Sequence, residues 1–379
     1  MRYDIFCRVV DNFGDAAVCW RLARQLANEQ GHVVRLWLDQ LAALAILRPE
    51  LDRNASHQSF DSVEVIQWSS AVGFEDTGDV VIEGFGCGLP NLYMQSMGAR
   101  TNKPLWIVLE YLSAEAWVAK HHGLPSPHPS IAVPRYFFFP GFSRNTGGLL
   151  RESHLLGRRE AFLADGNARR SLWAELGFPA PDREQIAVSL FGYDNPNAGA
   201  LIDAFAKSAK RIVAVVPPCR LRQQICAIPG IGQRQDGDSL RRGQLELRFI
   251  PFLPQPRYDE LLWACDWNFV RGEDSFVRAQ WAKLPFVWHI YPQSEQAHIK
   301  KLDAFLDLYL DGLDARNAVA LTGLWRAWNG SGQLIDHYWN QLCEARDTLR
   351  RHAQTWGDQL ADMPDLAANL ANFCSERLK

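Results

Sequence analysis

The sequence lacks the cysteine and histidine patterns that mark a metal site or a disulfide framework. Its eight cysteines are scattered, with no C-x-x-C pair, and neither they nor the ten histidines show metal-ligand spacing. Cysteines scattered in this way are typical of reduced thiols in the core of a cytosolic protein. We therefore expect neither disulfides nor a resident metal.

The sequence also lacks an excess of charge of either sign and any long apolar run. The formal net charge is −3 over 379 residues, which argues against a general nucleic-acid-binding surface. No segment approaches the roughly 20 apolar residues that cross a bilayer. The first residues, MRYDIFCRVV, have neither the basic region nor the cleavage site of a signal peptide. These absences predict a cytoplasmic protein that binds neither nucleic acid nor membrane.

What the chain does contain is an alternation of short apolar strands and helical patterns, which is typical of parallel α/β architecture. In the first half, strands are predicted at 3–9, 33–38, 63–68, 80–83, 105–109 and 136–139. After the Pro-Ala-Pro segment at 179–181, the alternation restarts with strands at 186–191, 212–216, 245–252 and 266–271. The length suits two domains, and we place them at 1–178 and 182–340, followed by helices at 341–379.

The carboxyl end of the first predicted strand carries two carboxylates in one turn. The segment Asp11–Asp15 leads directly into a helix predicted over 16–30, and Gly14 allows a close backbone approach. Open parallel sheets bind ligands beyond the carboxyl ends of their strands, so Asp11 and Asp15 are candidate catalytic residues. The alternative is structural: Asp15 caps the helix and Asp11 closes an Asx-turn.

A second turn of interest lies in VRGEDSFVRAQWAKLPFVWHIYP, residues 270–292, which reads as strand, glycine turn, acid-rich helix start and second strand. A helix that begins near Asp274 leaves its first N–H groups without intrahelical partners. Together with the helix dipole and Arg271, these groups attract an anion such as a phosphate. The alternative is an ordinary strand–helix–strand crossover in which Ser275 caps the helix.

Four separated segments together resemble one family, and the resemblance spans nearly the whole chain. The segments are RVVDNFGDAAVCWRLARQL from Arg8, WIVLEYLSAEAWV from Trp106, SLFGYDN from Ser189 and VRGEDSFVRAQWAKLPFVWHIYPQ from Val270. They are similar to the arginine rhamnosyltransferases that modify bacterial elongation factor P. The resemblance implies two Rossmann-like domains facing across a cleft, the GT-B type, with the last helices packed back on the first domain.

The resemblance also implies an activity: metal-independent, inverting transfer of L-rhamnose from dTDP-β-L-rhamnose to one arginine of folded elongation factor P, which is thereby activated to rescue ribosomes stalled at polyproline. No cofactor beyond the donor is implied. The first domain would bind the acceptor, and the second the nucleotide sugar. The family's proposed general base matches Asp15, with Asp11 as the second essential carboxylate. The substrate-binding positions implied are Asn12, Phe13, Gly14, Phe191, Tyr193, Phe252, Arg271, Glu273, Asp274 and Ser275, with Tyr258 at a further aromatic position.

Other interpretations stay open. Phe191 and Phe252 stack on thymine or pack in the core, while Glu110, Tyr111 and Glu115 meet the acceptor or cap the following helix. The segment EGFGCG at 83–88 favours a tight turn over a dinucleotide fingerprint because its spacing is G-x-G-x-G. An alternative function is a glycosyltransferase of the same architecture that acts on a lipid or small-molecule acceptor. A non-catalytic sugar-nucleotide or protein-binding module is disfavoured by the two aspartates.

Overall fold

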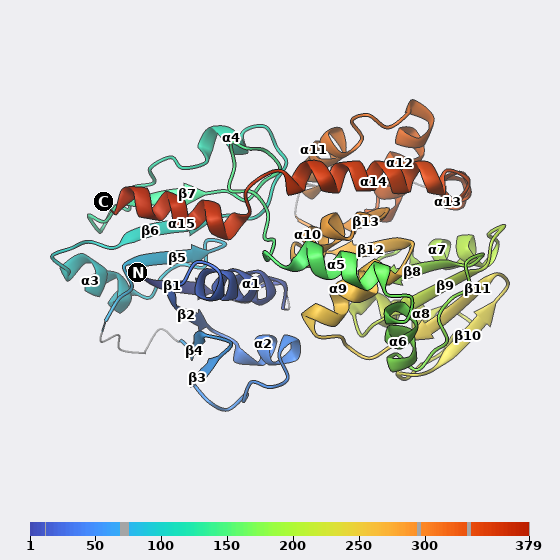
Figure 1. The fold of residues 1–379 in the computed structure, drawn as a ribbon, viewed down its shortest axis with the longest axis horizontal. Helices are drawn as coiled ribbons and strands as arrows, with labels where there is room; N and C mark the ends of the chain where they lie inside the picture. The colour runs from blue at the N-terminus through green and yellow to red at the C-terminus, as the bar shows by residue number, and fades with distance from the viewer. Residues whose placement is uncertain (12, 69–75, 294–296, 332–334, 379) are drawn as a thin grey trace. The chain divides into compact units, whose positions relative to one another are not determined.

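The computed structural model describes residues 1–11, 13–68, 76–293, 297–331 and 335–378, which form two compact units (Figure 1). Unit 1 comprises residues 1–153 and 361–379, and unit 2 comprises residues 154–360. Each unit is built on one largely parallel sheet with helices between its strands. The predicted α/β class is therefore confirmed.

Unit 1 holds a seven-stranded sheet in the order β3-β4-β2-β1-β5-β6-β7. Its strands are β1 (Arg2–Cys7), β2 (Val33–Leu38), β3 (His57–Phe60), β4 (Val63–Gln67), β5 (Val80–Gly84), β6 (Leu105–Leu109) and β7 (Arg135–Phe138). The helices of this unit are α1 (Gly14–Asn28), α2 (Leu41–Leu47), α3 (Asn91–Ala99), α4 (Val118–His121) and α15 (Leu366–Arg377). The central strands β1, β5 and β6 are almost wholly buried, as expected of parallel strands covered on both faces, and the buried charged groups Asp4 and Glu83 on them are hydrogen-bonded.

Strand β3 is the one strand of unit 1 for which the sequence analysis made no prediction. It pairs antiparallel with β4 through a two-residue turn, Asp61 and Ser62, and both residues have positive φ angles of 53° and 66°. Hairpin turns of this length favour positive φ at both central positions because their twist then matches that of the strands. The short segment HQSF has no apolar pattern of its own, and it forms a strand because this turn pairs it with β4.

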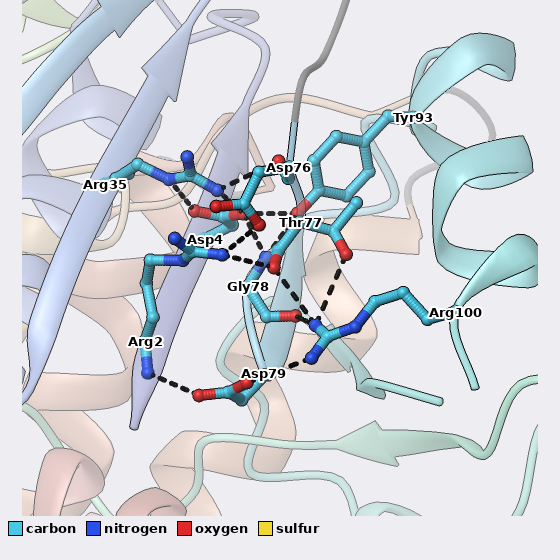
Figure 2. Close-up of polar contacts among 9 residues, drawn as sticks. All are labelled: Arg2, Asp4, Arg35, Asp76, Thr77, Gly78, Asp79, Tyr93 and Arg100. Atoms are coloured by element: carbon cyan, nitrogen blue, oxygen red, sulfur yellow. Dashed lines mark hydrogen bonds and ion pairs between the residues drawn. The ribbon is translucent and has the colours of Figure 1, made fainter. Parts of the chain in front are cut away.

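A network of charged side chains lies at the amino-terminal ends of the central strands of this sheet (Figure 2). Asp4 on β1 is fully buried, and its carboxylate accepts hydrogen bonds from Arg35 at 2.5 and 2.6 Å, from the Gly78 N–H at 2.7 Å and from the Tyr93 hydroxyl. Arg2, Asp76, Thr77, Asp79 and Arg100 surround this centre. The network ties β1, β2, the start of β5 and α3 together at the edge opposite to the turn of Asp11 and Asp15, so we assign it to stability.

The network gives a stability prediction. Asp4→Ala removes the shared acceptor of a nearly buried arginine and a buried tyrosine, so we expect unit 1 to lose about 3–5 kcal/mol of stability. Amide hydrogen exchange of peptides from β1 and β2 measures this within unit 1 alone. The control is Asp76→Ala, which breaks a half-exposed ion pair with Arg2 and should cost about 1 kcal/mol or less. Equal losses in the two variants would contradict the assignment.

Unit 2 holds a six-stranded sheet in the order β10-β11-β9-β8-β12-β13. Its strands are β8 (Ile186–Leu190), β9 (Ile212–Val216), β10 (Ser239–Arg242), β11 (Leu245–Phe249), β12 (Trp267–Arg271) and β13 (Phe286–His289). Its helices are α5 (Leu155–Ala164), α6 (Ala168–Glu175), α7 (Ala198–Ala206), α8 (Arg220–Ala227), α9 (Gln255–Ala264), α10 (Asp274–Ala282), α11 (Ala297–Tyr309), α12 (Ala315–Trp328), α13 (Ile335–Glu344) and α14 (Arg346–Ala361). Only the edge strand β10 runs antiparallel to its neighbour.

The boundary between the units differs from the predicted hinge at 179–181. Helices α5 and α6 precede that segment but belong to unit 2, since Leu172 and Trp173 pack in one core cluster with Ala187 and Val213 of its sheet. The Pro179 carbonyl accepts a hydrogen bond from Arg248 on β11 at 2.6 Å, which fixes the proline-rich segment against unit 2. The predicted ranges 1–178 and 182–340 therefore need correction.

The helices predicted at 341–379 are divided between the units. Trp339 on α13 packs against Phe205 and Trp267, and Trp356 on α14 donates a hydrogen bond to Gln280, so both helices lie on unit 2. Only residues 361–379 join unit 1, where α15 lies among the elements of the first half of the chain (Figure 1). Arg151 holds this segment by donating to the Ala361 carbonyl at 2.7 Å and to the Met363 carbonyl at 3.1 Å.

Candidate functional site

Asp15 is a buried carboxylate in the first turn of α1, just beyond the carboxyl end of β1. Its Oδ2 atom accepts hydrogen bonds from the backbone N–H groups of Val10 at 2.8 Å and Asp11 at 2.9 Å. These groups precede the helix, and no side chain caps α1 at Phe13. Asp15 therefore does not serve as the helix cap that the structural alternative required; its carboxylate reaches back over the turn.

The surroundings of Asp15 favour a carboxylate that is more basic than usual. Burial is the largest influence and raises the pKa of Asp15, and the charge of Asp11 raises it further. The two backbone N–H groups and the Tyr111 hydroxyl act in the opposite direction, but the net shift is upward. A carboxyl group with a raised pKa is better matched to accepting a proton near neutral pH.

The rest of the predicted turn lies around these two carboxylates. The Gly14 N–H donates to the Asp11 carbonyl at 2.6 Å, which closes the turn. A Cβ atom at Gly14 would come within 2.8 Å of Asp11 Oδ2, so a larger residue there would displace the Asp11 carboxylate from its present position. Phe13 is half-buried at the start of the helix. Asn12, which was predicted to bind substrate, lies outside the described residues.

Tyr111 and Phe85 lie near Asp15 at the carboxyl ends of the strands, a grouping that the sequence analysis did not predict. Tyr111 follows β6, and its hydroxyl donates to Asp15 Oδ1 at 3.4 Å. The Tyr111 ring stacks on Phe85, which follows β5, with centroids 4.5 Å apart and planes at 17°. The segment at 83–88 is a tight turn, as interpreted, with the Cys87 N–H donating to the Gly84 carbonyl.

In unit 2, a guanidinium group lies against two aromatic rings where β12 ends. Arg271 is buried, and its Cζ atom lies 4.6 Å from the ring centroid of Phe191 and 4.7 Å from that of Tyr193. A guanidinium group this close to two rings is held by cation–π attraction, and its planar N–H donors match a phosphate. The structure thus brings together Arg271, Phe191 and Tyr193 from two neighbouring strand ends.

The turn between β12 and α10 has the predicted form. Gly272 has a φ angle of +58°, and α10 begins at Asp274. The Ser275 hydroxyl accepts the Arg271 N–H at 3.0 Å and donates to the Arg271 carbonyl, so it holds the strand end and does not cap the helix. Asp274 accepts a hydrogen bond from the buried Gln255 at 3.4 Å. Glu273 stands at the half-buried position before the helix.

Tyr258 and His289 lie near this turn, and Phe252 is the remaining aromatic residue predicted to bind the donor. Tyr258 on α9 contacts Phe191 with ring centroids 5.6 Å apart, whereas Phe252 is half-buried in the segment after β11. His289, at the end of β13, was missed by the sequence reasoning. Burial, and secondarily the charge of Arg271, lower its pKa to about 3, so its neutral Nδ1 atom accepts the Tyr193 N–H at 3.3 Å. The sequence could have indicated His289 because it stands at the carboxyl end of the strand FVWH, where ligands bind in open parallel sheets.

Two features that bear on function classes are not found in the described part of the chain. No group of three or more histidine, cysteine, aspartate or glutamate side chains is arranged to hold a metal ion there. The helices within these ranges include none with the length and apolar character needed to cross a membrane.

Comparison with known proteins shows the family to which the chain belongs. The model of the family described as "Elongation-Factor P (EF-P) rhamnosyltransferase EarP" matches residues 3–375. The chain belongs to the EarP family. It is similar to the protein-arginine rhamnosyltransferase of Pseudomonas putida, with 46% identity over 371 residues that cover 98% of each chain. The corresponding protein of Pseudomonas aeruginosa is 44% identical over 376 residues, 99% of each chain.

Solved structures place this EarP-family chain among GT-B glycosyltransferases. A structure described as the basis of EarP-mediated arginine glycosylation of translation elongation factor EF-P is 35% identical, covers 99% of each chain and gives a TM-score of 0.71. The spinosyn rhamnosyltransferase SpnG, at 12% identity over 98% and 99% of the two chains, gives 0.53 and shares the fold alone. The predicted fold class and the assignment as a glycosyltransferase are thereby confirmed.

Proposed function

We propose that this enzyme transfers L-rhamnose from dTDP-β-L-rhamnose to the guanidinium group of one arginine on folded elongation factor P, in the cytoplasm and without a metal. The observation that carries the proposal is Asp15, a buried carboxylate with a raised pKa beside Asp11, in a chain whose relatives are named protein-arginine rhamnosyltransferases. An arginine acceptor calls for such a group because a guanidinium is a poor nucleophile until it loses a proton.

The reaction is a single displacement at the anomeric carbon of rhamnose. The guanidinium nitrogen forms the new C–N bond while the C–O bond to the diphosphate breaks, and the electron pair of that bond leaves with dTDP. Asp15 accepts the proton of the attacking nitrogen as that bond forms. Asp11 holds another edge of the guanidinium by a charge-assisted hydrogen bond, which orients the group. One displacement inverts the anomeric centre, so a β-linked donor gives an α-linked product.

Groups of unit 2 would stabilise the charge that develops on the leaving diphosphate. Arg271 supplies a fixed positive charge and the first N–H groups of α10 supply dipoles, so no divalent ion is needed in this role. The D-x-D sequence of this unit is engaged elsewhere: Asp236 accepts a hydrogen bond from Arg222 at 2.6 Å, and Asp238 accepts one from the Gln235 N–H at 2.8 Å. Asp236 thus pairs with an arginine of α8, and Asp238 closes its own loop.

A transfer assay tests the proposal as a whole. We expect consumption of dTDP-rhamnose to require elongation factor P, to place one rhamnose on one arginine, and to continue at the same rate in EDTA. Consumption with a lipid or small-molecule acceptor in place of the protein would favour the alternative glycosyltransferase. Loss of activity in EDTA that Mg²⁺ restores would overturn the metal-independent mechanism.

The donor half of the proposal has its own test. Arg271→Ala should weaken dTDP binding about 10- to 100-fold, since a hydrogen-bonded charge contributes about 1.5–3 kcal/mol. Titration calorimetry with dTDP measures the affinity. Arg241→Ala is the matched control because that arginine is exposed on the edge strand β10 and paired with Glu246. An unchanged affinity in Arg271→Ala would mean that the turn after β12 is only a structural crossover.

A further inference from the structure

The two oxygens of the Asp15 carboxylate have different partners. Oδ2 accepts both backbone N–H groups of the turn, those of Val10 and Asp11, whereas Oδ1 accepts the Tyr111 hydroxyl at 3.4 Å. An oxygen that already accepts two short hydrogen bonds has little capacity for a third partner. The proton of an acceptor nitrogen is therefore best received at Oδ1, the oxygen that the Tyr111 hydroxyl contacts.

The ring of Tyr111 is itself held in place. About one-third of the surface of Tyr111 is exposed, and its ring stacks in parallel on the ring of Phe85. Phe85 has a φ angle of +56°, which is uncommon for any residue other than glycine and particularly so for a bulky one. Such a conformation persists only where the surroundings enforce it.

The surroundings of Phe85 do enforce it. The Phe85 N–H donates to the Leu109 carbonyl at the end of β6 at 2.7 Å, two residues before Tyr111. The buried Glu83 carboxylate accepts the Gly88 N–H at 3.1 Å, as well as hydrogen bonds from Trp106 and Arg135, both at 3.1 Å. The turn is thus fixed on both sides of Phe85, and the platform for Tyr111 is rigid.

We propose that Tyr111 is a positioning residue for Asp15, with its hydroxyl setting the direction of Oδ1 and with Phe85 serving as the platform that fixes its ring. This inference rests on the proposed role of Asp15 as the proton acceptor. The Tyr111 hydroxyl stabilises the charged carboxylate, and it yields or shares its place at Oδ1 when the acceptor nitrogen arrives. A displacement of a catalytic group by about 1 Å can lower the rate about 100-fold. The loss of a residue that positions Asp15 should therefore have a measurable effect on the rate.

The pH dependence of the rate separates positioning from simple stability. Tyr111 donates to the ionised form of Asp15, so removing its hydroxyl raises the pKa of Asp15 and moves the acid limb of the pH–rate profile to higher pH. The other titratable groups that face Asp15 are Asp11 in the same turn, Cys7 on β1 and, through Cys7, Cys19 on α1 and Asp39 after β2. The substitution Tyr111→Phe leaves the side chains of these residues in place.

The experiment compares three variants of the full chain in the transfer assay. Tyr111→Phe keeps the stack on Phe85 but loses the hydroxyl, Phe85→Leu keeps the hydroxyl but loses the flat platform, and Tyr136→Phe on β7 is a matched loss of a hydroxyl away from Asp15. We expect both Tyr111→Phe and Phe85→Leu to lower kcat about 10-fold or more without changing the KM for the donor. In Tyr111→Phe, the acid limb of the pH–rate profile should move to higher pH. Tyr136→Phe should have the kcat and the pH–rate profile of the wild type.

A double variant links the effect to Asp15. In the Asp15→Asn background, Tyr111→Phe should cause no further loss, because the two residues act as one unit. An additional loss of the same size, or a change confined to the KM for the acceptor, would overturn the inference and make Tyr111 a contact of the acceptor. If Asp15→Asn itself kept full activity, the proposed function of Asp15 would fail; if only Tyr111→Phe kept wild-type kcat and pH profile, the positioning role alone would fail.

Discussion

Asp15→Asn should lower kcat by about 10²–10⁴-fold or more, the range typical of general bases, while leaving dTDP affinity unchanged. The amide has the same shape and its oxygen can still accept the Val10 and Asp11 N–H groups that Oδ2 accepts now. It cannot take the proton of the attacking nitrogen. The residues that we propose to bind the donor lie on unit 2, so we expect the affinity for dTDP to be independent of this carboxylate.

Rate measurements at saturating donor and acceptor, together with dTDP calorimetry, check this result. The matched control is Asp39→Asn, because Asp39 also accepts a backbone N–H near this turn, that of Val9 at 2.9 Å, but has no part in the proposed chemistry. We expect it to stay within a few-fold of the wild type. A near-wild-type rate in Asp15→Asn would remove this residue from the role of base.

The same assignment fixes the sign of the pH dependence. Below its pKa the Asp15 carboxyl is protonated and cannot accept a second proton, so the rate falls as the pH falls. Burial raises this pKa above the ordinary aspartate value, so the acid limb of the wild-type profile should lie at a higher pH than that of an exposed aspartate.

A folded acceptor should be modified far more efficiently than a linear peptide that carries the same arginine. A peptide must be ordered when it binds, at about 1–2 kcal/mol of backbone entropy for each residue fixed. Two or three such residues already amount to a kcat/KM lower by about 30-fold or more. The peptide also lacks remote contacts whose binding energy positions the guanidinium. Val10, which is 64% exposed next to the turn of Asp11 and Asp15, offers one apolar surface for such contacts.

The measurement is kcat/KM for the intact N-terminal domain of elongation factor P and for the peptide from the modified loop. The same domain with lysine in place of the target arginine serves as the control and should not be modified. Comparable kcat/KM for domain and peptide would refute the requirement for a folded acceptor and favour recognition of a sequence motif.

Much of the two sheets could be predicted because their inner strands are short, mainly apolar segments bounded by polar residues. The strands at 33–38, 105–109 and 212–216 have the predicted bounds. The edge strands β3 and β10 could not be found this way, since HQSF and SLRR are short and polar and are defined by their hairpin partners. The unit boundary was misplaced because nothing local in α5 and α6 says which sheet their apolar faces cover.

The candidate site was predictable in part for a related reason. Asp11 and Asp15 follow β1, and Arg271 ends β12, so each lies at the carboxyl end of a strand of its own sheet, where the sequence pattern alone indicates a ligand site. The contact of Tyr111 with Asp15 joins residues 96 positions apart, and it depends on the stack with Phe85 and on a backbone angle that the letters EGFGCG do not specify. The role of Ser275 likewise became visible only when its hydroxyl was found on the Arg271 backbone.

The return of residues 361–379 to unit 1 has a consequence for the order in which the protein matures during synthesis. Unit 2 is one uninterrupted stretch, whereas unit 1 lacks α15 until that late segment has left the ribosome. Cys374 and Leu370 of α15 are fully buried there, so the nascent first unit exposes their apolar docking surface while the whole of unit 2 is being made. The chain of the unit that carries Asp15 therefore starts to leave the ribosome before unit 2 and is completed after it.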